Sequence, residues 1–167
     1  KNIKYFGNLK YCSTLQNIDT VKNIKLETEK NSKIWCAVST HSGEEIFCAE
    51  VHKLLIKSHK NVKTIIIPRH VHRSANIIFE IENLGLKVSN HSSKPRSLKN
   101  TDIYVVDTFG ETNKFHKIGC SVFLGGSIIH RGGQNPLEAA RFGAKILHGP
   151  NIDNFKDVYK LLKSLNI

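Results

Sequence analysis

Short apolar runs alternate with longer amphipathic stretches along the chain. The apolar runs are nearly continuous, which is typical of parallel strands that are buried on both faces. Six of them are strand candidates, at 34–38, 64–67, 86–88, 103–106, 121–124 and 145–147. Between them lie helix candidates at 43–58, 74–84, 136–142 and from 154 onward. This alternation predicts an α/β domain with a Rossmann-like parallel sheet and helices on both faces.

The remaining segments complete the predicted organisation. Residues 89–100 are polar and contain Pro95, which favours a surface loop. Residues 1–30 do not continue the pattern and are interpreted as an interdomain segment, so that residues 31–167 form the α/β domain. The last helix candidate carries one apolar stripe for packing against the sheet, made of Phe155, Val158, Leu161, Leu162 and Leu165.

Length and composition suit one globular domain, at 167 residues with 40% hydrophobic and 23% charged residues. No run approaches the roughly 18 apolar residues of a membrane span, and the N-terminus lacks the apolar core of a signal peptide. The chain has no methionine, so we expect that Lys1 is not a native translation start and that sequence upstream of it has been removed.

The net charge of +11 comes from 25 basic and 14 acidic residues and bears on partners. The basic residues are spread along the chain without an RNP-like run or a series of stacking aromatics, so no nucleic-acid partner is expected. An anionic membrane surface fits the charge better, because nearby basic residues are attracted to anionic lipid. A plain lysine-rich surface is the alternative.

Cysteine and histidine are dispersed. The four cysteines have no C-x-x-C spacing, which favours buried free thiols and a reducing compartment. The nine histidines include one close pair, His70 and His72, without further ligands at metal spacing. No metal site is therefore expected.

A glycine-lined loop with a well-marked helix start has the pattern of an anion site. Asn135 is a good N-cap, Pro136 suits the first helical position, and Glu138 falls three residues after the cap. The preceding backbone can turn sharply and bring N–H donors close to a phosphate or carboxylate. The alternative is a loop that needs its glycines for tight turns alone. The glycines concerned are Gly125, Gly126, Gly132 and Gly133.

The loops that follow the strand candidates carry most of the polar chemistry. Ligands of open α/β sheets bind outside the carboxyl ends of the strands, so these loops predict a binding site. In the first loop Ser42 and Glu45 have the spacing of a capping box for the next helix. The second and fourth loops add Arg69, His70, Arg73, Asp107, Gly110 and Glu111.

Absent motifs narrow the ligand. The sequence has no G-x-G-x-x-G in the first strand-to-helix turn, no G-x-x-x-x-G-K-[ST] and no G-x-S-x-G. These absences argue against a conventionally held dinucleotide, a P-loop nucleoside triphosphatase and an esterase-type triad. A phosphorylated small molecule remains, held by Arg69, a helix start and a carboxylate that accepts hydrogen bonds from ribose.

Five motifs, in this order and spacing, resemble the C-terminal half of 3-deoxy-D-manno-octulosonic acid (Kdo) transferases. They are S-T-H-S-G-E-E, P-R-H, D-T-F-G-E, G-G-S-I-I-H-R-G-G-Q-N-P-L-E-A-A and H-G-P-N-I-D-N-F. The opening G-N-L-K-Y at 7–11 resembles the segment just before the second domain of that family. The resemblance covers nearly the whole chain.

The resemblance implies the donor-binding domain of a GT-B glycosyltransferase that uses no metal and inverts the anomeric centre. Such an enzyme moves Kdo from CMP-Kdo to a lipid A precursor, at the cytoplasmic face of the bacterial inner membrane, in lipopolysaccharide biosynthesis. The N-terminal domain of the family, with its anchor, acceptor groove and catalytic carboxylate, has no counterpart in this sequence, and the last part of the C-terminal region is absent too. We therefore expect a fragment, itself soluble, that binds donor and transfers nothing.

The family motifs imply a set of donor-binding positions in this sequence. Arg69 and the helix start near Asn135 are expected to hold the CMP phosphate or the sugar carboxylate, and Glu138 to accept from ribose. Lys10 would add positive charge near the leaving group. The full expected set is Lys10, Arg69, Gly110, Glu111, Gly126, Ser127, Asn135 and Glu138.

Two departures from the family pattern leave alternatives open. Phe109 stands where the family usually has methionine, and Gln134 where it usually has histidine. Neither departure removes an essential charge, although the second could alter a hydrogen bond beside the sugar. The alternatives are another GT-B transferase or epimerase that uses a UDP-sugar, and a non-catalytic nucleotide-binding module.

Overall fold

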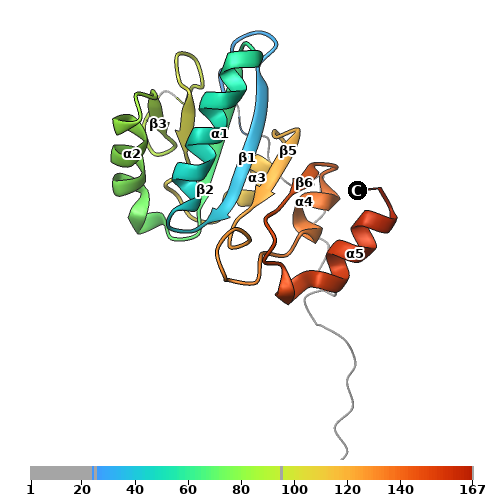
Figure 1. Ribbon diagram of the computed structural model, residues 1–167. Helices are drawn as coiled ribbons and strands as arrows, with labels where there is room; N and C mark the ends of the chain where they lie inside the picture. Colours follow the sequence, from blue (N-terminus) through green and yellow to red (C-terminus); the bar gives the residue numbers. More distant parts are fainter. Residues whose placement is uncertain (1–23, 25, 95, 167) are drawn as a thin grey trace, which may run out of the picture.

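A six-stranded, all-parallel sheet forms the centre of the computed structural model, which describes residues 24, 26–94 and 96–166 (Figure 1). The strands are β1 (Lys33–Thr40), β2 (Val62–Pro68), β3 (Val88–Asn90), β4 (Ile103–Val105), β5 (Ser121–Leu124) and β6 (Lys145–Leu147). The α-helices are α1 (Glu44–Ser58), α2 (Ser74–Asn83), α3 (Thr112–His116), α4 (Leu137–Arg141) and α5 (Lys156–Ser164), and two short 3-10 helices are η3 (Val71–Arg73) and η4 (Asp153–Phe155).

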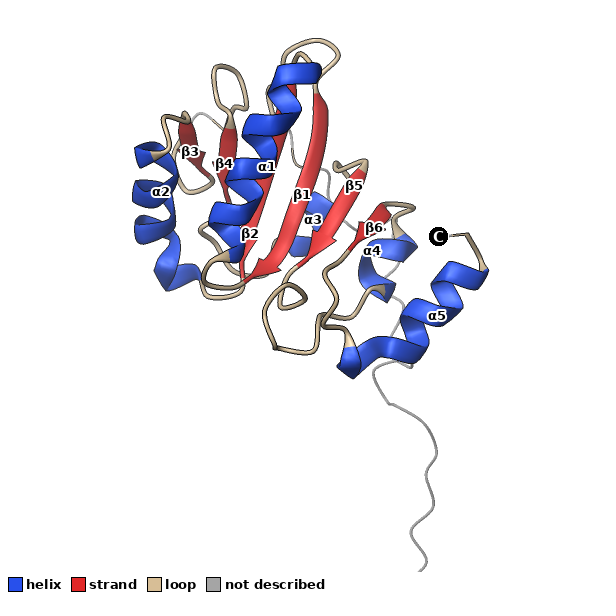
Figure 2. Ribbon diagram, in the orientation of Figure 1, coloured by secondary structure: helices blue, strands red, loops and turns tan. Residues whose placement is uncertain are grey.

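The strand order is β3-β4-β2-β1-β5-β6. The longest pairing is between β1 and β2, in the register Lys33 opposite Val62, and β5 lies against the other side of β1 with Trp35 opposite Ser121. The register shifts between Val38 and Thr40, at the carboxyl end of β1. Because all pairings are parallel, the carboxyl ends of the six strands lie at the same edge of the sheet (Figure 2).

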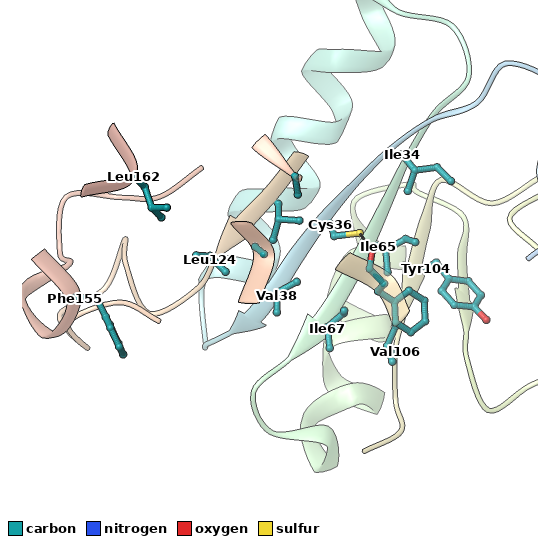
Figure 3. Packing of buried hydrophobic residues seen from close by; sticks show 14 of the residues in the cluster. Ile34, Cys36, Val38, Ile65, Ile67, Tyr104, Val106, Leu124, Phe155 and Leu162 are labelled. Atoms are coloured by element: carbon teal, nitrogen blue, oxygen red, sulfur yellow. Dashed lines mark hydrogen bonds between the residues drawn. The ribbon is translucent and has the colours of Figure 1, made fainter. Parts of the chain in front are cut away.

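The four inner strands, β4, β2, β1 and β5, contribute side chains to two apolar cores, one on each face of the sheet. On one face, Cys36 and Val38 pack with residues of α3, α4 and α5, as Figure 3 shows for part of this cluster. On the other face, Trp35 and Ala37 pack against α1 and α2. Successive residues of β1 thus point to opposite faces, and both are buried, which explains why the strand sequences are continuously apolar.

The predicted α/β class with its parallel sheet is confirmed. The strands at 121–124 and 145–147 have the predicted bounds, whereas the strand predicted at 86–88 is observed at Val88–Asn90. The sequence analysis missed α3, a single turn of five residues with too few positions to display a helical period.

Two local predictions need correction. The Ser42–Glu45 capping box does not form, because α1 begins at Glu44 after Gly43, whose φ of 91° lies in the left-handed region. The apolar stripe of α5 is only partly buried, since Leu161 and Leu165 are 55% and 57% exposed. They lie beside the stripe that faces the sheet, at the margin of the helix face that the domain covers.

Part of the predicted interdomain segment contacts the α/β domain. Glu27 forms a bridge with Ser97, and its carbonyl accepts a hydrogen bond of 2.8 Å from the Leu98 N–H. The Glu29 carboxylate accepts from Lys63 at 3.2 Å. Residues 1–23, including the G-N-L-K-Y segment and Lys10, lie outside the described residues.

Candidate functional site

The carboxyl edge of the sheet has a topological switch point between β1 and β5. From the central strand β1 the chain moves to β2 on one side, and it later returns to β5 on the other side. In open α/β sheets the loops diverge at such a point and leave a crevice for a ligand. The loop after β1 begins at His41, and the loop after β5 begins at Gly125, so these two loops border the candidate site.

Three polar side chains surround Gly126 at this switch point. A Cβ on Gly126 would lie 3.5 Å from the His41 ring, 3.3 Å from Cβ of Arg131 and 3.5 Å from the Gln134 amide nitrogen. The φ of Gly126 is +68°, so the tight turn itself also favours glycine. The loop after β5 thus folds back so that Arg131 and Gln134 stand beside the loop after β1.

Gly125 brings the same loop against the end of β1. A Cβ at this position would collide with the backbone of Ser39 and Thr40. Ser39 itself has a φ of 54°, a conformation that costs a non-glycine residue energy and that clusters at functional sites. The two loops are therefore in direct backbone contact at the centre of the edge.

A row of histidine rings connects the loop after β1 with the loop after β2. The His41 and His70 ring centroids are 5.9 Å apart, and those of His70 and His72 are 5.6 Å apart. Burial lowers the pKa of His41, an effect that the Glu44 carboxylate opposes and that His70 and Arg131 reinforce. The neutral form of the His41 ring is therefore favoured, as a hydrogen-bonding group beside the Arg131 side chain.

Two arginines follow β2, and their surroundings differ. Arg69 is exposed, and its side chain has no hydrogen-bond or ion-pair partner in the part of the chain that the structure describes. Arg73 donates 2.9 Å and 3.3 Å hydrogen bonds to the two carboxylate oxygens of Glu45, which is 1% exposed. Arg69 is therefore available to a ligand, whereas Arg73 compensates a buried carboxylate.

The loop after β4 presents an aromatic ring to solvent. Phe109 is 80% exposed, and the next residue, Gly110, is exposed with a φ of 77°. Glu111 is engaged internally, because it pairs with His91 and accepts a 3.0 Å hydrogen bond from Lys114. Burial alone would raise the pKa of Glu111, but the Lys114 hydrogen bond and the adjacent His91 hold it below its usual value.

The backbone N–H groups of the glycine loop bind a carboxylate of the protein itself. The N–H groups of Gly126, Ser127 and Ile128 donate to Glu44 over 2.8 to 3.2 Å, and His41 N–H donates to the same carboxylate at 2.9 Å. From the sequence, these N–H groups were expected to approach a phosphate or carboxylate of a ligand. In the structure they donate to the carboxylate of Glu44, a residue of the protein itself.

Ser127 is likewise occupied within the protein. It is 0% exposed, its hydroxyl donates to the Leu124 carbonyl, and that hydroxyl accepts a 2.9 Å hydrogen bond from Gly149 N–H. Its carbonyl accepts from Asn151 N–H at 2.9 Å. Ser127 therefore supports the loop and presents no free donor at its surface.

The start of α4 has the predicted capping contact. The Asn135 side-chain oxygen accepts a 3.1 Å hydrogen bond from the Leu137 N–H, beyond Pro136. The helix is only five residues long, so its macrodipole is small. Glu138 is exposed on its first turn, where it can accept from a ligand hydroxyl.

The structure thus brings the loops after β1, β2 and β5 together at one edge, as the sequence predicted. Sequence reasoning missed the roles of Glu44 and Arg131. The partners of Glu44 in the loop after β5 are 82 to 84 residues away in the sequence, so local spacing gave no signal for them. For Arg131 the signal was its place within the glycine block.

Among the described residues, no group of three or more histidine, cysteine or acidic side chains is placed to hold a metal ion. Over the same residues, no helix is long and apolar enough to cross a membrane.

Comparison with known proteins identifies the family. No protein-family model matches the chain. Two curated relatives are the probable mitochondrial 3-deoxy-D-manno-octulosonic acid transferase of Arabidopsis thaliana, 32% identical over 98% of this chain, and the 3-deoxy-D-manno-octulosonic acid transferase of Rickettsia bellii, 32% identical over 95% of it. The chain spans 38% of the length of each. The chain is a homologue of the Kdo transferases.

A solved structure of this family has the same fold. The C-terminal CMP-Kdo binding domain of WaaA from Acinetobacter baumannii superposes with a TM-score of 0.75 and 28% sequence identity. The match covers 82% of this chain and 72% of that one. The predicted family and the GT-B domain class are therefore confirmed.

Proposed function

We propose that this chain is the CMP-Kdo-binding part of a Kdo transferase of lipopolysaccharide biosynthesis. The observation that carries the proposal is the match, with a TM-score of 0.75, to the CMP-Kdo binding domain of WaaA from Acinetobacter baumannii. The switch-point edge supports the same function, because Arg69 is exposed there without a partner among the described residues, and CMP-Kdo carries a phosphodiester and a carboxylate.

The donor would lie across the loops after β1, β2, β4 and β5. Arg69 would pair with the phosphate or the sugar carboxylate, and Arg131 would supply a second cation beside Gly126. Gly126 and Ser127 would contribute to the site through the conformation of their loop. Their N–H groups would not bind the phosphate, because they donate to the Glu44 carboxylate. Lys10, which lies outside the described residues, would add positive charge near the leaving group.

The nucleoside would reach from the loop after β4 to the first turn of α4, on the face of the sheet where α3 contacts α4. Phe109 offers an exposed ring for stacking on the base, and the Gly110 turn lets the backbone approach it. Glu138 would accept from a ribose hydroxyl, next to the turn that Asn135 caps. Glu111 would keep the loop after β4 in place through His91 and Lys114.

Transfer would require a general base beside the acceptor hydroxyl. The acceptor hydroxyl of a lipid A precursor would attack the anomeric carbon of Kdo, its proton would pass to a general base, and CMP would leave. Positioning and proton transfer of this kind lower a barrier by roughly 7 to 11 kcal/mol. We place the base on the N-terminal domain of the longer enzyme and expect no transfer by this chain alone.

A basic helix face suggests where the domain would approach an anionic membrane surface. Lys156, Lys160 and Lys163 recur on one side of α5, and together with Lys145 they border a groove of about 1080 Å³ between α4, β6 and α5. Each basic residue near anionic lipid contributes about 1 kcal/mol of attraction. The proposed location is the cytoplasmic face of a bacterial inner membrane, with the acceptor bound through the N-terminal domain.

The direct test is a titration of the isotope-labelled chain with CMP, followed by amide NMR. Shifts are expected in the loops that begin at His41, Arg69, Val106 and Gly125 and at the start of α4. Shifts confined to the α5 groove, or none at saturating CMP, would contradict the proposal. In a coupled assay, transfer from CMP-Kdo should appear only when the chain is joined to the upstream half of a homologous enzyme, and transfer by the 167-residue chain alone would place the base within it.

A UDP-sugar enzyme is the second candidate. The exposed Phe109 is compatible with it, because an aromatic ring stacks on uracil as well as on cytosine. Preferential binding of UDP over CMP would decide for it.

A further inference from the structure

Glu44 is a fully buried carboxylate with four hydrogen-bond donors around it. Its side chain is 0% exposed, at the first position of the 15-residue helix α1. One oxygen accepts from Ser127 at 3.2 Å and Ile128 at 3.1 Å, and the other accepts from Gly126 at 2.8 Å and His41 at 2.9 Å. All four donors are backbone N–H groups, so the chain around the carboxylate has the geometry of an anion-binding nest.

This arrangement ties together two loops that are distant in the sequence. His41 belongs to the loop after β1, and the other three donors belong to the loop after β5. The carboxylate therefore fixes the position of one loop relative to the other. At the surface above it, the His41 ring, Arg131 and Gln134 stand around Gly126, where the donor is proposed to bind.

We propose that Glu44 is a built-in anion that fills the nest of the glycine loop and positions the donor-binding edge at the switch point. The carboxylate does not touch the donor. It acts through the backbone of residues 126–128, which it holds in the conformation that presents Arg131 beside His41. The effect of Glu44 on nucleotide binding rests on the proposed function. The binding of the Glu44 carboxylate by the four N–H groups can be tested without any nucleotide.

Removal of the carboxylate leaves a cavity whose shape suggests the experiment. Glu44→Ala deletes a CH₂–COO⁻ group and leaves four converging N–H groups, and acetate supplies a methyl and a carboxylate of nearly the same size. Glu44→Ala should melt at a lower temperature than the wild type and bind CMP about tenfold more weakly or worse. Added acetate should restore both properties in this variant, and chloride at equal ionic strength should restore neither.

Glu44→Gln provides a matched contrast that retains side-chain volume. Its amide NH₂ would face two N–H donors in place of an acceptor, so the loop should be displaced and CMP affinity should fall. Acetate should have no effect, because the side chain still fills the nest. Where Glu44→Ala fails to fold in chloride, recovery of its fold in acetate would itself support the proposal, and Glu44→Gln would carry the affinity measurement.

Two control variants separate positioning from general stability. Glu50→Ala, on an exposed position of the same helix, should leave melting and CMP affinity unchanged with or without acetate. Ile77 lies on the buried face of α2. Ile77→Ala should lower the melting temperature while leaving CMP affinity intact in the folded protein. The Ile77 variant shows what a loss of stability alone does to nucleotide binding.

The outcomes distinguish the two proposals. Unchanged CMP affinity in folded Glu44→Gln, or acetate that restores melting without restoring affinity in Glu44→Ala, would overturn the positioning role. A lack of any acetate effect on Glu44→Ala would overturn the nest itself. Failure of the wild-type chain to bind CMP would instead reject the proposed function, and the acetate-dependent melting would still report on the nest.

Discussion

The two arginines of the loop after β2 allow a prediction in which one variant is the control for the other. Arg69 is exposed with no side-chain partner among the described residues, whereas Arg73 is bidentate on Glu45. We expect Arg69→Ala to weaken nucleotide binding without altering stability. We expect Arg73→Ala to lower stability, because it strands a buried carboxylate.

The magnitudes follow from these environments. A charge-assisted contact is worth about 1.5 to 3 kcal/mol, so Arg69→Ala should weaken CMP binding by about tenfold to hundredfold. Its effect on unfolding should stay within about 0.5 kcal/mol, as for other exposed side chains. Glu45 is 1% exposed and keeps only the 3.1 Å hydrogen bond from Thr40 when Arg73 is removed, so Arg73→Ala should cost about 3 kcal/mol.

Calorimetric titration with CMP and thermal melting measure the two effects on the same samples. A loss of about 3 kcal/mol in a domain of this size corresponds to a decrease in Tm of roughly 6 to 12 °C. Unchanged CMP affinity in folded Arg69→Ala would remove Arg69 from the donor site. A marked fall in the Tm of the same variant would show that Arg69 has a structural role and would refute the contrast.

Two other predictions concern the helix cap and a buried ring. Asn135→Ala should cost about 1 kcal/mol in thermal stability and also weaken CMP binding, and a loss of stability alone would make the cap purely structural. Burial lowers the pKa of His116 to about 4, against about 6.5 in an unfolded chain. The unfolded state therefore binds more protons between these values, and His116 should remove about 2 kcal/mol of stability between pH 6.5 and pH 5. His116→Leu should flatten this part of the stability profile measured by denaturant titration, and an unaltered profile would contradict the assignment.

The fold was accessible from the sequence because its strands are buried on both faces. Ile65, Ile66 and Ile67 form a continuous apolar run within β2, which is buried throughout, as expected for a parallel strand covered on both faces. The helix α3 escaped because Thr112–His116 is one turn whose buried side chains follow no visible period. The bounds of α1 shifted because the left-handed Gly43 delays the helix start.

The candidate site was predictable in outline and not in its electrostatics. The motif P-R-H placed Arg69 after a strand, and the parallel topology brought it to the site edge. Local spacing could not show that the Glu44 carboxylate accepts a hydrogen bond from the Gly126 N–H in the loop after β5, because that contact depends on the pairing of β1 with β5. The glycine pattern therefore indicated an anion nest correctly, while the identity of the anion required the three-dimensional structure.

The central claim is that the edge between β1 and β5 binds the cytidine nucleotide of a Kdo donor. Parallel calorimetric titrations of the 167-residue chain with CMP, UDP and AMP test it most directly. We expect saturable binding of CMP at one site, weaker binding of UDP and AMP, and CMP binding weakened by about tenfold to hundredfold in Arg69→Ala. Equal affinity for all three nucleotides, preference for UDP, or no binding of CMP would contradict it.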